Sequence, residues 1–312
     1  MVTVGNSNYN GGYLDVIYKV FDTGNEVAQQ GLAVIETGIK KKKSLPKMSA
    51  TSNPFGDYVA GVPTETKTTT YSERELEPQP MMMFERFLPE EFNDVWPDWQ
   101  PTDDFTNAEI NGEVLDAILE LNQNGMGNQI ARLFWQGDTT LLANDPLNKF
   151  NGIITRAAAD VNVPKLTPAG VINSANVVDI IKDFWQNIPD YLIQNPDYKI
   201  IMNMTDYKIL QLANLALKEA FDGVLDQAQL NMFLGNMIIG LSSMKKDHIL
   251  GAVCNVDRAT SNLFMGVDQD EATERPRIEK EANGSKYYFI RIDVKADANY
   301  REASELLLYE PV

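Results

Sequence analysis

The sequence contains one cysteine and one histidine among its 312 residues. Cys254 therefore has no partner for a disulfide within the chain, and a catalytic triad or a multi-histidine metal site would need His248. Cys254 lies in the apolar run ILGAVCNV, which predicts a small buried residue rather than a nucleophile. His248 has charged neighbours and is predicted to lie in a loop or at a strand edge.

Long apolar runs are also missing. The longest, around residues 232–241, is far shorter than the ~20 residues that span a bilayer. The N-terminal MVTVGNSNYNGG has neither the charged nor the apolar region of a secretory signal. We therefore expect a protein made in the cytoplasm, with no membrane partner.

Positive charge is scarce, and the net charge is −17. This argues against a protein that reads nucleic-acid sequence, because such proteins carry a basic surface. An apolar fraction of 44% is that of a folded protein, and the length favours about two domains. Copies of so acidic a chain repel one another, so any assembly needs buried apolar contacts or salt.

Motifs that carry chemistry are absent from the sequence. It has no glycine-rich phosphate loop, C-x-x-C, H-E-x-x-H or G-x-S-x-G. Asp268, Asp270 and Glu271 lack the glycine and distal glutamate of a calcium loop, which favours a solvated loop. We predict no catalytic, cofactor-binding or metal-binding residue, and a protein that is not an enzyme.

What is present is a polar ribbon from residue 51 that leads to a long helix ending near residue 138. From 66 to 76 the residues favour an extended chain without an apolar face, and Gly56, Gly61 and Pro63 suggest a returning hairpin arm. Between Glu65 and Glu109 there are twelve acidic residues against three basic ones. Such a ribbon offsets its ordering entropy, about 1–2 kcal/mol per residue, by lying on another surface.

Residues flanking the ribbon supply candidate contacts. Thr23 and Glu26 have capping-box spacing, which predicts a helix through Ile35 that stops near Gly38. The four lysines that follow either form a solvated helix end or contact phosphate or an acidic neighbouring subunit. The methionine and aromatic cluster after the ribbon either docks on a neighbour or seals the hairpin on its own subunit. The candidate inter-subunit residues are Lys40, Lys41, Lys42, Lys43, Lys67, Glu73, Arg74, Glu75, Met82, Phe84, Trp96 and Trp99.

A long helix is predicted over about 104–136. Apolar residues keep the spacing of one buried face, and Gly125 and Gly127 predict a bend or break. Gly137 suits a C-terminal cap. The residues of the buried face are Ile110, Val114, Ala117, Leu121, Ile130 and Phe134.

The rest of the chain predicts an α/β unit at 170–268, followed by a hairpin. Helices are expected at 173–187 and 205–221, and strands at 198–202, 233–241, 249–256 and 263–267. Residues 278–282 and 286–294 predict a β-hairpin on a type I′ turn at Asn283-Gly284, and 305–309 a final strand. The expected buried helix faces are Val177, Ile180, Ile181, Phe184 and Ile188, and Ile209, Leu212, Ala216 and Ala220.

In this order of elements the chain resembles the major capsid proteins of tailed bacteriophages with the HK97-type fold. The local matches are LFWQGD at 133–138 followed by NGI at 151–153, MNMTDYKIL at 202–210 and NLFMGVDQDEA at 262–272. The resemblance implies an α+β fold with an N-arm at 1–50, an E-loop at 51–82 and a P-domain at 83–167 that holds the spine helix. An A-domain at 168–268 and a return hairpin with the terminal strand at 269–312 complete it, unless that strand rejoins the A-domain.

The resemblance implies a homo-oligomer of pentamers and hexamers that forms an icosahedral virion shell around double-stranded DNA. Scaffolding, portal and decoration proteins are possible further partners, and no cofactor is implied. Some relatives join subunits by Lys–Asn isopeptide bonds, for which Lys67 and Asn299 are the conceivable but unfavoured pair. The alternatives are an encapsulin-like compartment that holds protein cargo and an unrecognised α+β hydrolase or binding protein.

Overall fold

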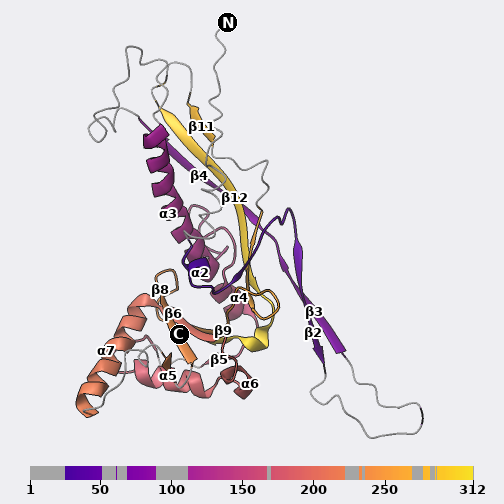
Figure 1. Ribbon diagram of the computed structural model, residues 1–312, viewed down its shortest axis with the longest axis vertical. Coiled ribbons are helices and arrows are strands. Elements are labelled where there is room, and N and C mark those ends of the chain that lie inside the picture. The colour runs from indigo at the N-terminus through magenta and orange to yellow at the C-terminus, as the bar shows by residue number, and fades with distance from the viewer. Residues whose placement is uncertain are drawn as a thin grey trace.

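A computed structural model describes residues 25–50, 61, 69–88, 112–166, 170–221, 232–233, 236–268, 277–281, 285 and 287–311. These residues form two sheets with helices and a two-stranded hairpin that projects from the body (Figure 1). The mixture of helices and mostly antiparallel strands confirms the predicted α+β class. Within the described ranges, no helix has an apolar stretch long enough to cross a bilayer.

The first sheet has five strands and is built on the long strand β12 (Tyr288–Tyr300). Strand β4 (Gln79–Phe87) pairs with it antiparallel, as do β11 (Arg277–Lys280) and β10 (Leu263–Val267), and β1 (Val34–Glu36) runs parallel to β10. We expected the last strand of the hairpin to end at 294. It continues to Tyr300 because Ala296, Ala298 and Tyr300 are buried, while the polar residues between them find hydrogen-bond partners.

The hairpin β11–β12 is confirmed, but the two-residue turn is not. A turn at Asn283-Gly284 would pair Glu281 with Lys286. Instead Arg277 pairs with Arg291, and the Glu281 amide donates to the Tyr287 carbonyl over 3.0 Å. This register requires a longer connection, whose residues 282–284 lie outside the described part.

The spine helix α3 (Gly112–Gln136) runs beside β12 and β4 (Figure 1). It is continuous through Gly125 and Gly127, so of the expected bend or break the break is wrong. A helix tolerates each glycine at about 1 kcal/mol, and packing of its last turns offsets this cost. Ile130 and Phe134 are buried as predicted, whereas Ile110 and the side chains of Val114, Ala117 and Leu121 lie outside the described residues.

The second sheet has six strands with apolar packing on both faces. One face of the sheet packs against three helices, α5 (Val177–Gln186), α6 (Asp190–Ile193) and α7 (Met204–Phe221). The other face of the sheet contributes to the core that α3 and α4 (Ile153–Ala159) also line. All residues of β9 are buried, which explains its uninterrupted apolar sequence. In order, the strands are β5 (Lys165–Leu166), β13 (Leu307–Tyr309), β9 (Ile249–Val253), β6 (Tyr198–Asn203), β8 (Asn236–Leu241) and β7 (Met232–Phe233).

The predicted face of α5 is buried throughout, but that of α7 is only partly right: Ile209 packs against the core, and the side chain of Ala220 lies outside the described residues. Leu210 is buried, whereas Leu212 is 66% exposed and Ala216 is exposed. The first turn of α7 is fixed by Asp206, whose buried carboxylate accepts a 2.7 Å hydrogen bond from the Asp247 amide. This contact turns Leu210 rather than Leu212 toward the sheet.

Strand β10 belongs to a different sheet from the one expected, and strand β13 follows one of the two alternatives left open by the sequence. β10, assigned by sequence to the unit at 168–268, pairs with β1 and β12 in the five-stranded sheet. The terminal strand β13 pairs with β5 and β9 and thus rejoins the six-stranded sheet. Both strands are wholly buried, so their apolar pattern identifies strands without indicating which sheet they enter.

The expected N-terminal helix is mostly wrong. Helix α2 (Glu26–Gln29) is a single turn, capped by Asn25, whose Oδ1 accepts from the Val27 amide over 3.0 Å. Glu26 does not fold back as a capping box requires; its carboxylate accepts hydrogen bonds from Ser242 and Ser243. Thr23 lies outside the described residues.

The projecting hairpin pairs β2 (Lys43–Ala50) with β3 (Thr69–Leu76), from Lys43 opposite Leu76 to Ala50 opposite Thr69. The partner of β3 is therefore β2, not the arm expected near residues 56–63. Of those residues only Gly61 is described.

Candidate functional site

The hairpin β2–β3 has two chemically different faces. Lys47 and Arg74 fall on one face with Leu45 and Leu76, because residues opposite each other in a strand pair share a face and alternate along each strand. The other face carries Met48 and Tyr71, which are directly opposite each other and 71% and 60% exposed, and Glu73 and Glu75. We call these the inner and outer faces of the hairpin.

The inner face is anchored to the body of the same chain by apolar packing. Leu45 is 2% and Leu76 0% exposed, and both join a small core with Val34, Ile39 and Phe264. Sequence reasoning missed this anchor because Leu45 precedes the ribbon, and Leu76 is the last residue of an extended stretch that shows no apolar face. The hairpin therefore does not depend on a second copy for all of its apolar contacts.

Three cations on the inner face contact acids from three parts of the body. Lys43 pairs with Glu36, Lys47 lies 2.9 Å from Glu305 and 3.2 Å from Glu302, and Arg74 pairs with Asp160. Lys42, by contrast, lies 3.0 Å from Glu75 and 3.1 Å from Glu77, on the opposite strand and just beyond it. Lys42 and Lys43 thus pair within their own chain.

Asp160 is the most strongly perturbed carboxylate of this region. Burial opposes its ionisation, but hydrogen bonds from the Asn162 amide, Arg74 and Tyr300 outweigh burial and hold its pKa at about 2. Arg74 also lies over the Tyr300 ring, 4.2 Å from its centroid. The hairpin base is therefore held by a charge that persists over the physiological pH range.

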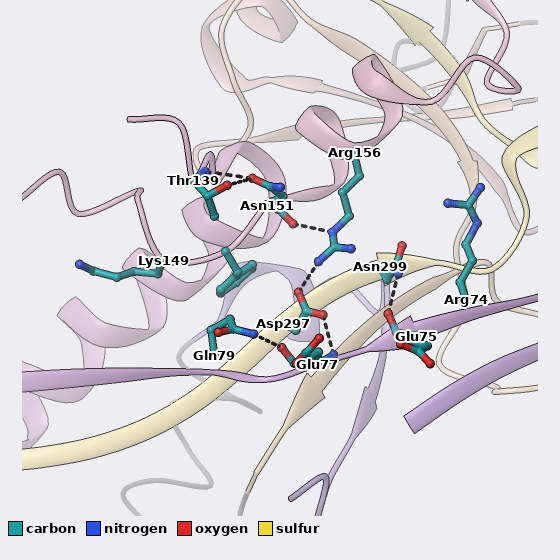
Figure 2. A pocket seen from close by; sticks show the side chains of 11 residues that line it. Arg74, Glu75, Glu77, Gln79, Thr139, Lys149, Asn151, Arg156, Asp297 and Asn299 are labelled. Carbon is teal, nitrogen blue, oxygen red and sulfur yellow. Dashed lines mark hydrogen bonds and ion pairs between the residues drawn. The ribbon is translucent and has the colours of Figure 1, made fainter. Parts of the chain in front are cut away.

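A polar pocket of about 470 Å³ lies where the hairpin base meets β12 and the loop before α4 (Figure 2). Asp297, 2% exposed, accepts from Arg156 over 2.7 Å and from the Glu77 amide over 2.8 Å. Burial raises the pKa of Asp297, and Arg156 opposes that rise. The contacts join β12, α4 and the chain between β3 and β4.

Asn299, in the same pocket, does not fit an isopeptide bond. It is 4% exposed, its Nδ2 donates to the Glu75 carbonyl over 2.7 Å, and its Oδ1 accepts from the Tyr300 amide over 2.9 Å. An attacking lysine would need to displace both hydrogen bonds. Lys67, the other member of that pair, lies outside the described residues, as do Trp96 and Trp99.

The sheet face that does not pack on the core is a second candidate surface. Along β4, Met81, Met83 and Phe87 pack against the core shared with α3, whereas Met82 and Phe84 are 57% and 55% exposed. The Phe84 ring stacks on Phe289 of β12 with centroids 5.4 Å apart. The methionine cluster thus faces both ways: part of it packs on its own subunit, and part is left exposed.

Three of the residues considered for chemistry, Cys254, His248 and Asp268, are buried. Burial raises the pKa of Cys254 to about 12 and lowers that of His248, which is 4% exposed. Asp268 pairs with Lys295 rather than facing solvent as expected, and Asp270 and Glu271 lie outside the described residues. Among the side chains that the structure describes, no cluster could hold a metal ion.

The WQGD and NGI segments meet at two glycines. The Gly137 amide donates to the Leu133 carbonyl at the end of α3, and the Gly152 amide donates to the Gly137 carbonyl over 2.8 Å. A Cβ on Gly137 would lie 2.3 Å from the Phe150 carbonyl oxygen. Gly137 ends the helix as expected, but close packing, rather than a left-handed cap, is the reason for glycine.

No protein-family model and no curated protein matches the chain. Solved structures match it over most of its length, and they define its class: the chain has the HK97-type capsid fold, as predicted. The satellite phage P4 procapsid including the size determination (Sid) protein is 13% identical, covers 96% of this chain and 99% of that chain, and has a TM-score of 0.58. The capsid of the native GTA particle is 8% identical, with 92% and 90% covered and a TM-score of 0.59. A virus-like particle from Pyrococcus furiosus is 10% identical, with 95% and 96% covered and a TM-score of 0.52.

Proposed function

We propose that the chain is the major capsid protein of a tailed bacteriophage. Copies assemble into pentamers and hexamers, and these close an icosahedral shell around double-stranded DNA. The observation that carries the proposal is the match to a phage procapsid over nearly the whole of both chains. The three similar structures described above are capsids and a particle rather than enzymes, in keeping with a structural role. The purified protein examined by electron microscopy tests it.

Contact between copies is assigned to the outer face of the hairpin and to the exposed side of β4. Single exposed apolar residues are common on proteins. Here, four large ones lie on the strand pairs β2–β3 and β4–β12: Met48, Tyr71, Met82 and Phe84. Methionine and aromatic residues are enriched in the centres of protein interfaces. In a shell they are buried against neighbours and offset the repulsion of a chain with net charge −17.

Replacing both Met82 and Phe84 with serine tests the contribution of these side chains to assembly without disturbing the fold. The double variant M82S/F84S is expected to keep a melting temperature near that of the parent, because both side chains are more than half exposed. Shell yield in sedimentation and electron microscopy is expected to fall at least about tenfold, since each lost contact recurs in every copy. The matched control is M83S, which is expected to lower the melting temperature because Met83 packs on the core. Normal shell yield from M82S/F84S contradicts the assigned surface.

The further partners of the proposed shell are packaged DNA and separate scaffolding, portal and decoration proteins, with assembly in the host cytoplasm. Contact of Lys40 to Lys43 with a neighbouring copy or with DNA stays a prediction, which shell yield at low salt tests on a variant with four alanines. A protein compartment of the encapsulin type is the alternative, and the matches to phage capsids favour it less than the capsid. Nucleic acid inside purified particles favours the capsid, and protein cargo favours the compartment.

A further inference from the structure

We propose that the β2–β3 hairpin clamps the connection between the two sheets, so that hairpin orientation and the angle between the sheets change together. The connection is residues 301–306, which include the 3-10 helix η2 (Ala303–Glu305). It links the end of β12 in the five-stranded sheet to the start of β13 in the six-stranded sheet. The clamp would position the hairpin for the proposed assembly, and in that respect it rests on the proposed function.

One contact holds the β12 end of the connection. Tyr300, the last residue of β12, is fully buried beneath the Arg74 guanidinium of β3. Its hydroxyl donates to Asp160 Oδ2 over 2.8 Å, the same oxygen that Arg74 contacts. Because each member touches the other two, a rotation of β3 away from Tyr300 breaks both the ion pair and the cation–π contact.

A second contact holds the β13 end. Lys47 of β2 bridges Glu302, the N-cap residue of η2, and Glu305, the last residue of η2. Glu302 is itself fixed, because its amide donates to Asn262 Oδ1 over 2.7 Å and its carbonyl accepts from Asn262 Nδ2 over 2.8 Å. Asn262 is fully buried, so the acceptor of the lysine is a rigid part of the body.

Both cations lie on the inner face of the hairpin, Lys47 on β2 and Arg74 on β3. One rigid strand pair therefore grips both ends of a short connection. A change in the angle between the sheets pivots residues 301–306 and moves Tyr300 relative to Glu305. The hairpin then has to turn with it or to release one of its contacts.

Partial burial distinguishes these contacts from ordinary surface pairs. The side chains of Lys47 and Glu305 are 23% and 21% exposed, and those of Arg74 and Asp160 are 30% and 14% exposed. Lys42 and Glu75 are 52% and 53% exposed, and their pair lies within the hairpin. Water screens the Lys42 pair more strongly, so Lys42 provides a matched control that also has two ion pairs but touches no part of the connection.

Spin-label distances in the unassembled full-length chain test the clamp. Cys254 is fully buried, so cysteines introduced at exposed Met48, Met82 and Val171 take the labels selectively. The 48–171 pair measures the hairpin against the six-stranded-sheet unit, and the 82–171 pair measures the two sheets against each other. We expect one narrow population for each pair in the parent. Lys47→Met and Arg74→Met should each add a longer-distance population to both pairs, and Lys42→Met should add none.

Three results overturn the proposal. Unchanged distances in Lys47→Met and in a folded Arg74→Met variant exclude the clamp. The same change in Lys42→Met excludes the assigned contacts. A change in the 48–171 pair alone excludes the coupling between hairpin and sheets. Lys47 is not part of the buried core, so we expect Lys47→Met to fold. The distances in this variant therefore test the clamp even if Arg74→Met fails to fold. The measurement needs no shells, so it remains readable if electron microscopy rejects the capsid proposal.

Discussion

At the residue scale, the charged contacts under the hairpin differ from those that the sequence suggests. The lysine run and the acidic ribbon invited pairing between copies, yet Lys42 and Lys43 contact Glu75 and Glu36 of the same chain. Arg74 and Lys47 find acids more than 80 residues away. Opposite charges in a sequence predict that pairs form, but only the tertiary fold determines which ones.

Asp160 should make stability depend on acid pH. Its pKa in the folded chain, about 2, lies below the 3.8 of an unperturbed aspartate. The unfolded chain therefore binds the proton more readily, and the stabilisation is complete above about pH 4 and lost as the pH falls through 2. Asp160→Asn is expected to lower the free energy of unfolding by about 2 kcal/mol at pH 7. Urea unfolding at pH 7 and at pH 2.5 measures this difference.

In that comparison the gap between variant and parent should shrink at the lower pH, because at pH 2.5 unfolding of the parent is accompanied by protonation of Asp160, which stabilises the unfolded chain. Asp179→Asn is the matched control, since its side chain is 76% exposed and its partner, Lys182, lies on the same helix. A gap that is equally large at both pH values contradicts the assigned role of the Asp160 charge.

At the element scale, the end of the spine helix depends on a backbone contact between two glycines. Gly137→Ala is expected to cost roughly 3 kcal/mol of unfolding free energy, because the new methyl group meets backbone atoms that have no freedom to move. Gly125→Ala, inside α3 with nothing within 4 Å, should instead stabilise the chain by about 1 kcal/mol. Chemical unfolding of both variants measures the pair of effects.

Destabilisation by Gly125→Ala would mean that the helix is not continuous there, and a neutral Gly137→Ala would remove the packing explanation. The same pair of glycines shows what the sequence does and does not reveal. A glycine after an apolar helical pattern predicts the helix end at 137. Glycines within the pattern also predict a break at 125–127, and there packing overrides local preference.

The other elements likewise divide into those that apolar spacing predicts and those that depend on tertiary contacts. The buried face of α5 and strands β6 and β10 follow directly from apolar spacing. The sequence indicates only a methionine and aromatic cluster at β4, because MMM hides the alternation that packing against α3 imposes. The end of β12 was missed because its polar residues Asp297 and Asn299 need partners that only the fold supplies.

At the scale of the whole molecule, the sequence favours an assembling protein, because it contains a polar ribbon and lacks catalytic motifs. The fold, which is that of capsid proteins, agrees with this prediction. The ribbon itself needs a different explanation. Its base is packed and charge-paired on its own subunit, so a neighbour is required only for the outer face. The contacts between copies were beyond sequence reasoning, because they depend on which exposed faces come together in an assembly.

The central claim is that copies of this chain build a shell, and electron microscopy of the purified full-length protein tests it most directly. We expect closed icosahedral particles, or tubes and capsomer rings where closure fails, with hexamers and pentamers resolved in class averages. A protein that remains monomeric or forms only a small closed oligomer, at any salt concentration tested, would contradict the account.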